Sequence, residues 1–259
     1  MAYKRYDTWR TMKEFEKMLI DFCHKYGYDM VASLNDVIDY IIGYFDPYGE
    51  PIDGWSKTVE QNTEIFNMVK KYIEVLDGRL QETTWADLWG DLLMSLRTKG
   101  GGFEQYFTPS EMCNLMARVT VDDNEMCEVE GLGERLIISD PTCGSGRNLL
   151  AAHARLTEEF QKAPYLIAED IDVICCKLSA VNMAVHGAVG EVVCHNTLLE
   201  PDSIRIGYLV NHELYKKMTF TPTIRRCSDP GQFVVTSTWK RRAEKVKSEK
   251  KEPMQLSLF

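Results

Sequence analysis

The sequence predicts an α/β fold preceded by a helical region, and two observations carry this prediction. The first is the segment 136–146, LIISDPTCGSG, in which an apolar run ends in Asp-Pro and leads through a tight glycine turn into a helical pattern. The second is the alternation of apolar runs with helical stretches between residues 136 and 194, which is typical of a parallel, doubly wound sheet. Residues 1 to about 100 show helical spacing instead.

Four helices are predicted in the N-terminal region, over residues 8–26, 31–45, 56–80 and 84–96. Ser56 and Glu60 suggest a capping box, displaced by one residue, at the start of the third helix. We interpret the methionine and aromatic positions of these helices as core. The glycines at 100–102 are typical of a hinge, so the sequence predicts three parts, namely residues 1–99, 103–239 and 240–259.

Strands and helices alternate in the second part. A helix is predicted at 147–160 after the glycine turn, and an apolar run at 165–168 ends in acidic residues. Another helix ends near residue 187, and a short run follows at 191–194. Beyond that point the pattern weakens, and three further runs could each form a strand, namely 204–210, 217–223 and 232–239.

The bulk composition is that of a globular chain, with 44% hydrophobic and 27% charged residues. No apolar run is long enough to span a bilayer and the N-terminus does not resemble a signal peptide, so we expect a cytoplasmic protein without membrane contact. The eight cysteines include no Cys-x-x-Cys pair, and we expect them to be reduced, with neither disulfides nor a metal site.

Charge is distributed unevenly along the chain. The net charge of −9 argues against a general nucleic-acid coat protein, although local contact with DNA stays open. Residues 240–251, KRRAEKVKSEKK, contribute a net +5, which leaves −14 for the remainder. This segment is interpreted either as a solvated linker or as a contact to DNA phosphates.

The glycine turn has the chemistry of a ligand site. Gly144 and Gly146 lack a Cβ, so the backbone can bend sharply and a ligand can approach it closely. The helix that follows presents free N–H groups at its N-terminus, which suit a carboxylate or a phosphate.

Further motifs flank this turn in a fixed order. Gln-Tyr-Phe-Thr-Pro stands upstream of the turn at 105–109. Downstream of the turn follow an acid-ended run, a helix that ends near His186-Gly187, and His-Asn-Thr-Leu at 195–198. This series resembles the DNA adenine-N6 methyltransferases, in particular the methylation subunits of type I restriction-modification systems, over roughly residues 103–199. The resemblance implies a Rossmann-like sheet that binds S-adenosylmethionine (SAM). Because only about 100 residues lie between 136 and 239, we expect that sheet to be short and incomplete.

The resemblance also implies the residues that contact SAM. The glycine turn and the upstream motif would hold the methionine end, an acid on the second strand would bind the ribose, and residues after the second and third strands would hold the adenine. The implied residues are Tyr106, Thr108, Asp140, Thr142, Gly144, Gly146, Asp170, Ile171 and Asn196. Three alternatives stay open: Asp140 as a mere cap of its turn, Asp170 as an exposed acid at a helix start, and Glu169 as the ribose ligand.

Catalysis is where the match is weakest. The family uses an Asn/Asp/Ser-Pro-Pro-Phe/Tyr loop, whose acceptors orient the target amine and whose aromatic ring stacks on the flipped base. No Pro-Pro occurs in this sequence. The candidate residues are Asp229, Pro230 and Phe233, although the aromatic residue stands one position late and residues 223–227 make a poor buried strand. The alternative is a surface turn.

The last five residues, Gln255–Phe259, resemble the peptide that binds the bacterial sliding clamp, and the alternative is that they pack back on the domain. Two functions follow from these observations. The first is a SAM-dependent enzyme that methylates adenine N6 in DNA. The second is a degenerate SAM-binding module that acts through the clamp or through a second methyltransferase or specificity subunit.

Overall fold

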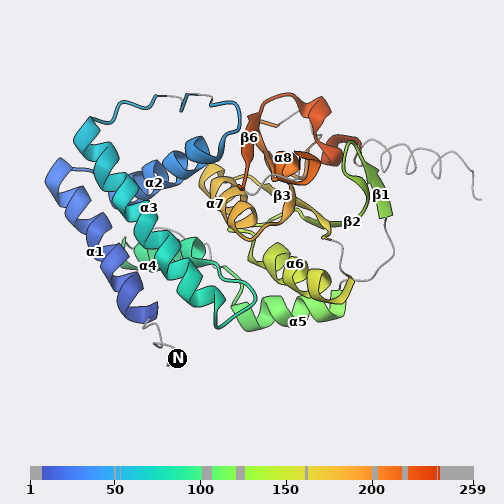
Figure 1. The fold of residues 1–259 in the computed structure, drawn as a ribbon, viewed down its shortest axis with the longest axis horizontal. Helices are drawn as coiled ribbons and strands as arrows, with labels where there is room; N and C mark the ends of the chain where they lie inside the picture. The colour runs from blue at the N-terminus through green and yellow to red at the C-terminus, as the bar shows by residue number, and fades with distance from the viewer. Residues whose placement is uncertain are drawn as a thin grey trace, which may run out of the picture.

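The computed structural model describes residues 8–49, 51–52, 54–100, 107–120, 126–160, 163–199, 204–217, 221–237 and 239. It is a mixed α/β structure in which N-terminal helices pack beside a six-stranded sheet (Figure 1). None of the described helices is both long and apolar enough to cross a membrane.

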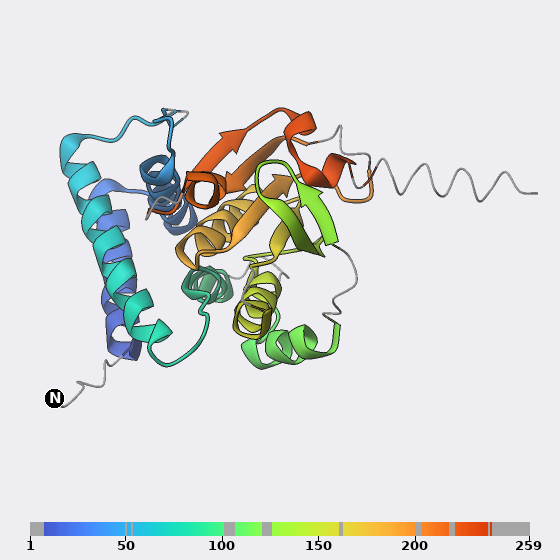
Figure 2. The same cartoon turned by 45° about the vertical axis from the view of Figure 1, so that its right-hand side comes forward.

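The first three N-terminal helices lie within three residues of their predicted bounds, whereas the fourth begins and ends four residues later than predicted. They are α1 (Thr8–Tyr26), α2 (Met30–Phe45), α3 (Val59–Leu80) and α4 (Leu88–Gly100). In both views α1 and α3 run side by side on the outside of the molecule (Figure 2). The capping box predicted from Ser56 and Glu60 is wrong, because Thr58 caps α3: its hydroxyl accepts from the N–H of Gln61 at 3.2 Å, and the Gln61 side chain accepts from the Thr58 N–H at 2.8 Å.

The sheet has the order β1-β2-β3-β4-β5-β6, and three central strands are parallel. The strands are β1 (Met126–Val129), β2 (Gly133–Asp140), β3 (Tyr165–Asp170), β4 (Val189–Cys194), β5 (Ile206–Val210) and β6 (Ile224–Cys227). The pairs β1–β2, β4–β5 and β5–β6 are antiparallel. The parallel part therefore consists of the motif strands β2, β3 and β4, as the sequence predicted.

Helices connect these strands and join the sheet to the N-terminal region. They are α5 (Ser110–Thr120), α6 (Arg147–Phe160), α7 (Val173–Val185) and α8 (His212–Lys217). Most of α7 is buried, since it packs on β4 on one side and on α2 on the other. One buried cluster runs from Phe15 in α1 through the helices to Ile224 in β6, so the helices and the sheet share a core.

The C-terminal predictions are correct only in part. The run predicted at 204–210 forms β5, whereas the next strand is β6 and not 217–223. The sequence makes 223–227 a poor buried strand, and β6 forms there as an edge strand: Ile224 and Cys227 are buried, while Arg225 and Arg226 stay partly exposed. The described residues of the segment 232–239 do not form a strand: the short helix η2 (Pro230–Gln232) ends at its first residue, and residues 234–237 are helical.

Candidate functional site

The carboxyl ends of β2, β3 and β4 meet at one edge of the sheet, and the glycine turn lies over that edge. Asp170, the last residue of β3, points toward this turn: its Oδ2 accepts from the N–H of Gly144 at 2.9 Å. Its Oδ1 accepts from the N–H of Asp172 at 2.9 Å. Two backbone donors therefore hold the Asp170 carboxylate beside the turn, and its remaining lone pairs can accept further hydrogen bonds.

Glu169, the other candidate on this strand, points elsewhere. Its Oε2 lies 2.6 Å from Nε2 of His195, and its Oε1 accepts from the hydroxyl of Ser139 at 3.4 Å. Both Glu169 and His195 are buried. Successive side chains of a strand face opposite sides of the sheet, so Glu169 faces away from the turn that Asp170 contacts.

The glycine turn requires its glycines. Gly144 and Gly146 have φ angles of +54° and +85°, in the left-handed region that side chains disfavour. A Cβ on Gly144 would lie 2.9 Å from the ring of Phe107, and a Cβ on Gly146 would lie 2.9 Å from the hydroxyl of Ser179. Side chains therefore pack against the turn at both glycines, and the Phe107 ring lies directly against Gly144.

Asp140 lies at the end of β2 beside the same turn. Its Oδ1 accepts from the N–H of Thr142 at 3.0 Å, and its Oδ2 accepts from the side-chain amide of Asn148 at 3.2 Å. Asp140 therefore caps its own turn, which is one of the two interpretations that the sequence left open. A carboxylate offers about four lone-pair sites, so this bonding leaves acceptors for a ligand ammonium.

The side predicted to hold adenine carries exposed apolar groups. Ile171, which directly follows β3, is 59% exposed, and Leu198, in the loop after β4, is 92% exposed. Oδ1 of Asn196 accepts from the N–H of Leu198 at 3.1 Å, so Asn196 orders its own loop. Tyr106, predicted at the methionine end, lies outside the described residues.

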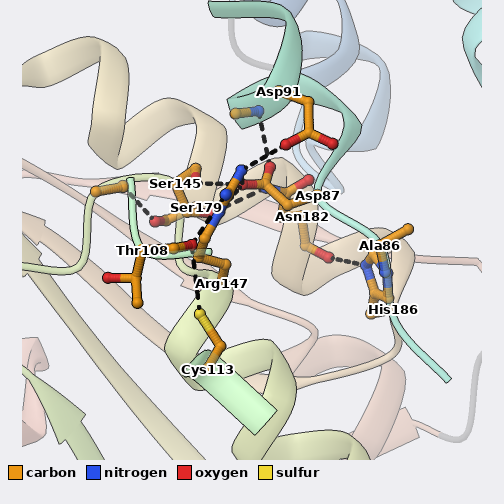
Figure 3. Close-up of polar contacts among 12 residues, drawn as sticks. Ala86, Asp87, Asp91, Thr108, Cys113, Ser145, Arg147, Ser179, Asn182 and His186 are labelled. Carbon is orange, nitrogen blue, oxygen red and sulfur yellow. Dashed lines mark hydrogen bonds and ion pairs between the residues drawn. The ribbon is translucent and has the colours of Figure 1, made fainter. Parts of the chain in front are cut away.

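A buried polar cluster beneath the turn was not predicted (Figure 3). Asp87, which precedes α4, accepts hydrogen bonds from Ser145, from Nε of Arg147 at 2.8 Å and from Asn182 at 2.8 Å. Arg147 also donates to the carbonyl oxygen of Thr108 at 3.0 Å. The Thr108 side chain points away from Arg147 (Figure 3).

The neighbouring carboxylates favour the charged form of Arg147. Burial alone would lower the pKa of Arg147, but the carboxylates of Asp87 and Asp91 raise it. Burial raises the pKa of the Cys143 thiol in the turn well above its ordinary value, so this cysteine stays protonated. Sequence reasoning missed Asp87 because it lies inside the helix predicted at 84–96, where a single acidic residue does not indicate a buried contact. The helix begins instead at Leu88, and Asp87 is its N-cap, as it accepts from the Gly90 N–H at 2.8 Å.

The residues predicted for catalysis lie away from this cluster. Asp229 and Pro230 follow β6, which four inter-strand steps, roughly 19 Å, separate from β2. The Asp229 carboxylate accepts from the N–H of Gly231 at 2.9 Å and caps η2. Phe233 is only 2% exposed and packs on Gly207 in the core, an arrangement that does not favour its predicted role as a stacking surface for a base.

Comparison with known proteins identifies the family. A family model described as N-6 DNA Methylase matches residues 84–220, which is more than half of the chain. The chain belongs to the N-6 DNA methylase family. The N-6 DNA methylase match starts upstream of the predicted boundary at 99–103, so it includes α4 and Asp87 together with the glycine turn, Asp170 and Asn196. Asp229, Pro230 and Phe233 lie outside it.

The similarity to an individual protein is more limited. The chain is similar to the type II methyltransferase M.MamI of Microbacterium ammoniaphilum, with 30% identity over 156 residues. This alignment covers 55% of the present chain and 40% of M.MamI, so the chain spans less than half the length of that relative. No solved structure matches the chain significantly.

Proposed function

We propose that this chain binds SAM at the carboxyl edge of β2, β3 and β4 and serves the methylation of adenine N6 in DNA. The observation that carries the proposal is the Asp170 carboxylate, which two backbone N–H groups hold against the glycine turn. An acid at the end of the second motif strand is suited to bind ribose hydroxyls. Membership of the N-6 DNA methylase family supports SAM as the ligand and DNA as the substrate.

The residues at this edge fit the three parts of SAM. Asp140, Thr142 and Thr108 would hold the amino-acid end together with backbone N–H groups near the two glycines of the turn. The N–H groups of Gly144 and Gly146 themselves already donate to Asp170 and to the carbonyl oxygen of Cys143, so neighbouring N–H groups would face the ligand. Asp170 would hold the ribose, while Ile171 would cover the adenine and Asn196 would bind its amine. SAM supplies an electrophilic methyl group, and the protein's part is to orient it toward the acceptor.

The location of the acceptor residues separates two versions of this function. In the first, the chain itself orients the target amine with Asp229 and Pro230. In the second, the chain supplies the SAM site and a partner methyltransferase or specificity subunit supplies the acceptor loop. Because β6 and η2 lie at the far edge of the sheet from β2, the second version is better supported.

Calorimetric titration with SAM tests the binding site. We expect Asp170→Ala to weaken SAM binding about ten-fold or more, because it removes the ribose acceptor. The matched control is Glu169→Gln, which changes the neighbouring acid on the opposite face and should leave SAM affinity within about two-fold of wild type. Equal effects of the two substitutions, or no binding by the wild type, would contradict the proposed site.

Transfer of labelled methyl groups from SAM to DNA tests the two versions. If the chain alone methylates DNA and Asp229→Ala abolishes the signal, the first version is correct. If SAM binds but DNA is labelled only after a partner chain is added, the second version is correct. Methylation that is unaffected by Asp229→Ala and needs no partner would exclude both versions.

A sliding-clamp contact is a separate part of the proposal. Residues 255–259 and the basic segment 240–251 lie outside the described residues, and the clamp-like pattern QLSLF supports this contact. A clamp pull-down should capture the full chain and fail when the five residues are replaced by alanine. A clamp and DNA as partners would place the protein in the cytoplasm.

A further inference from the structure

The Asp87–Arg147 ion pair is buried at the junction of the helical region and the sheet. The Asp87 side chain is 2% exposed and the Arg147 side chain is 8% exposed, with Nη2 of Arg147 at 2.7 Å from Oδ2 of Asp87. Removing two charges from water is costly, and well-packed apolar residues often replace such a pair without loss of stability. Stability alone therefore does not explain why this ion pair is present. The groups that the pair contacts suggest another role.

Arg147 holds the segment that precedes α5. Its Nη1 donates to the carbonyl oxygen of Thr108, and its guanidinium lies over the Phe107 ring at 5.4 Å from the ring centre. Phe107 in turn packs against Gly144. A single guanidinium group thus contacts both residues 107 and 108 beside the glycine turn, and Figure 3 shows its bond to Thr108.

The underside of the turn is held by the same cluster. Asn182 donates to both Oδ1 of Asp87 at 2.8 Å and the carbonyl oxygen of Ser145 at 2.9 Å, and Ser179 donates to the carbonyl oxygen of Gly144 at 2.9 Å. The C=O and N–H of a trans peptide point in opposite directions. Anchoring the Gly144 carbonyl on α7 therefore directs the N–H of Ser145 to the side away from α7.

We propose that Asp87 and Arg147 are positioning residues that make the site selective for the amino-acid half of its ligand. This inference rests on the proposed function, in which residue 108 and the turn contact the methionine end of SAM. The ribose and adenine contacts, Asp170 and Ile171, receive no hydrogen bond from this pair among the described residues. Loss of the pair should therefore weaken recognition of one half of SAM and spare the other.

The test compares two ligands on one variant. Calorimetry is done with SAM and with 5′-methylthioadenosine, which keeps the nucleoside and lacks the amino-acid group. We expect Arg147→Met to weaken SAM binding about ten-fold or more and to change methylthioadenosine binding by less than about two-fold. Arg147→Lys keeps the charge but cannot bond Asp87, Asp91 and Thr108 together, so it should give an intermediate loss for SAM alone.

The matched control is Lys177→Met. Lys177 also forms a buried ion pair between the helical region and the sheet side, with Asp39 at 2.8 Å, but it does not contact the turn. We expect this variant to leave the ratio of the two affinities unchanged. If Arg147→Met fails to fold, Ser145→Ala, which removes only one hydroxyl from the cluster, should shift the ratio in the same direction.

The outcomes are distinguishable. An equal loss of both ligands in Arg147→Met and Ser145→Ala, or no loss of either, would overturn the positioning role while leaving the SAM site intact. A wild-type protein that binds neither ligand would overturn the proposed function and this inference together. A changed ratio in Lys177→Met would show that any buried pair has the effect, and would also overturn it.

Discussion

Gly90 in α4 has no room for a larger side chain, because the Asp87 cluster packs directly against it. A Cβ at this position would overlap Oδ2 of Asp87 and lie 2.6 Å from the hydroxyl of Ser145. These atoms are held by several hydrogen bonds and cannot move aside without breaking the cluster. Residue 90 must therefore be a glycine for α4 to pack this closely against the glycine turn.

Gly90→Ala should therefore lower the free energy of unfolding by about 2 kcal/mol, within the usual range for overpacking, and should also weaken SAM binding. Urea denaturation and calorimetry measure the two effects. Gly43→Ala is the matched control in α2, since its Cβ would meet only the flexible end of Ile52. A Gly90→Ala protein as stable as Gly43→Ala would contradict the packing described.

Glu191 is fully buried in β4 and accepts from the N–H groups of Val234 and Val235 and from the hydroxyl of Tyr165. Burial raises its pKa to about 7, although these donors act in the opposite direction. The folded protein therefore binds more protons than the unfolded chain between the ordinary pKa of a glutamate and pH 7. Stability from this residue is complete at low pH and is lost as the pH rises through 7.

We expect the difference in unfolding free energy between wild type and Glu191→Gln to change by on the order of 3 kcal/mol between pH 4.5 and pH 8. Urea titrations across this range measure it. His153 and His212 have pKa values lowered to about 4 by burial and act in the opposite sense, but they are common to both proteins and cancel. Parallel pH profiles for the two proteins would contradict the raised pKa.

At the scale of elements, α3 shows how a cap selects the start of a helix. Both Ser56 and Thr58 can cap a helix, and both are exposed. Thr58 is favoured because Gln61 stands three residues later and completes the reciprocal pair of hydrogen bonds. The start of α3 at Val59 follows from that pair.

Thr58→Ala should destabilise the protein by about 1 kcal/mol, because it leaves an N-terminal N–H of α3 without its acceptor. Ser56→Ala is the control and should have no measurable effect. Thermal unfolding of the two variants provides the comparison. The opposite ranking would restore the cap first expected at residue 56.

For the whole molecule, the shared core is the dominant feature. Helix α7 packs on β4 and on α2, and Asp87, which precedes α4, belongs to the cluster below the turn. The side of α7 that faces away from the sheet is covered only when the N-terminal helices are present. The domain boundary at 99–103 remains a prediction. Because one buried cluster is continuous across it, we expect that the second part does not fold independently.

A fragment of residues 103–239 should accordingly show no cooperative unfolding transition, because α7 would expose the side that packs on α2 and α4 in the full chain. Circular dichroism during a urea titration measures this, with the full chain as the control. A sigmoidal transition of the fragment would contradict the interdependence of the two parts.

The sequence by itself determined β2, β3 and β4, the glycine turn and the acid at its edge, because these depend on local patterns: apolar runs, positive-φ glycines and a polar residue at each strand end. It also determined the family, since the order of these motifs lies along the chain. Only the tertiary structure decided that Asp170 and not Glu169 faces the turn, that Asp87 and Arg147 support it, and that Phe233 is buried. These facts depend on contacts between residues far apart in the chain and on the strand order, which no local pattern contains.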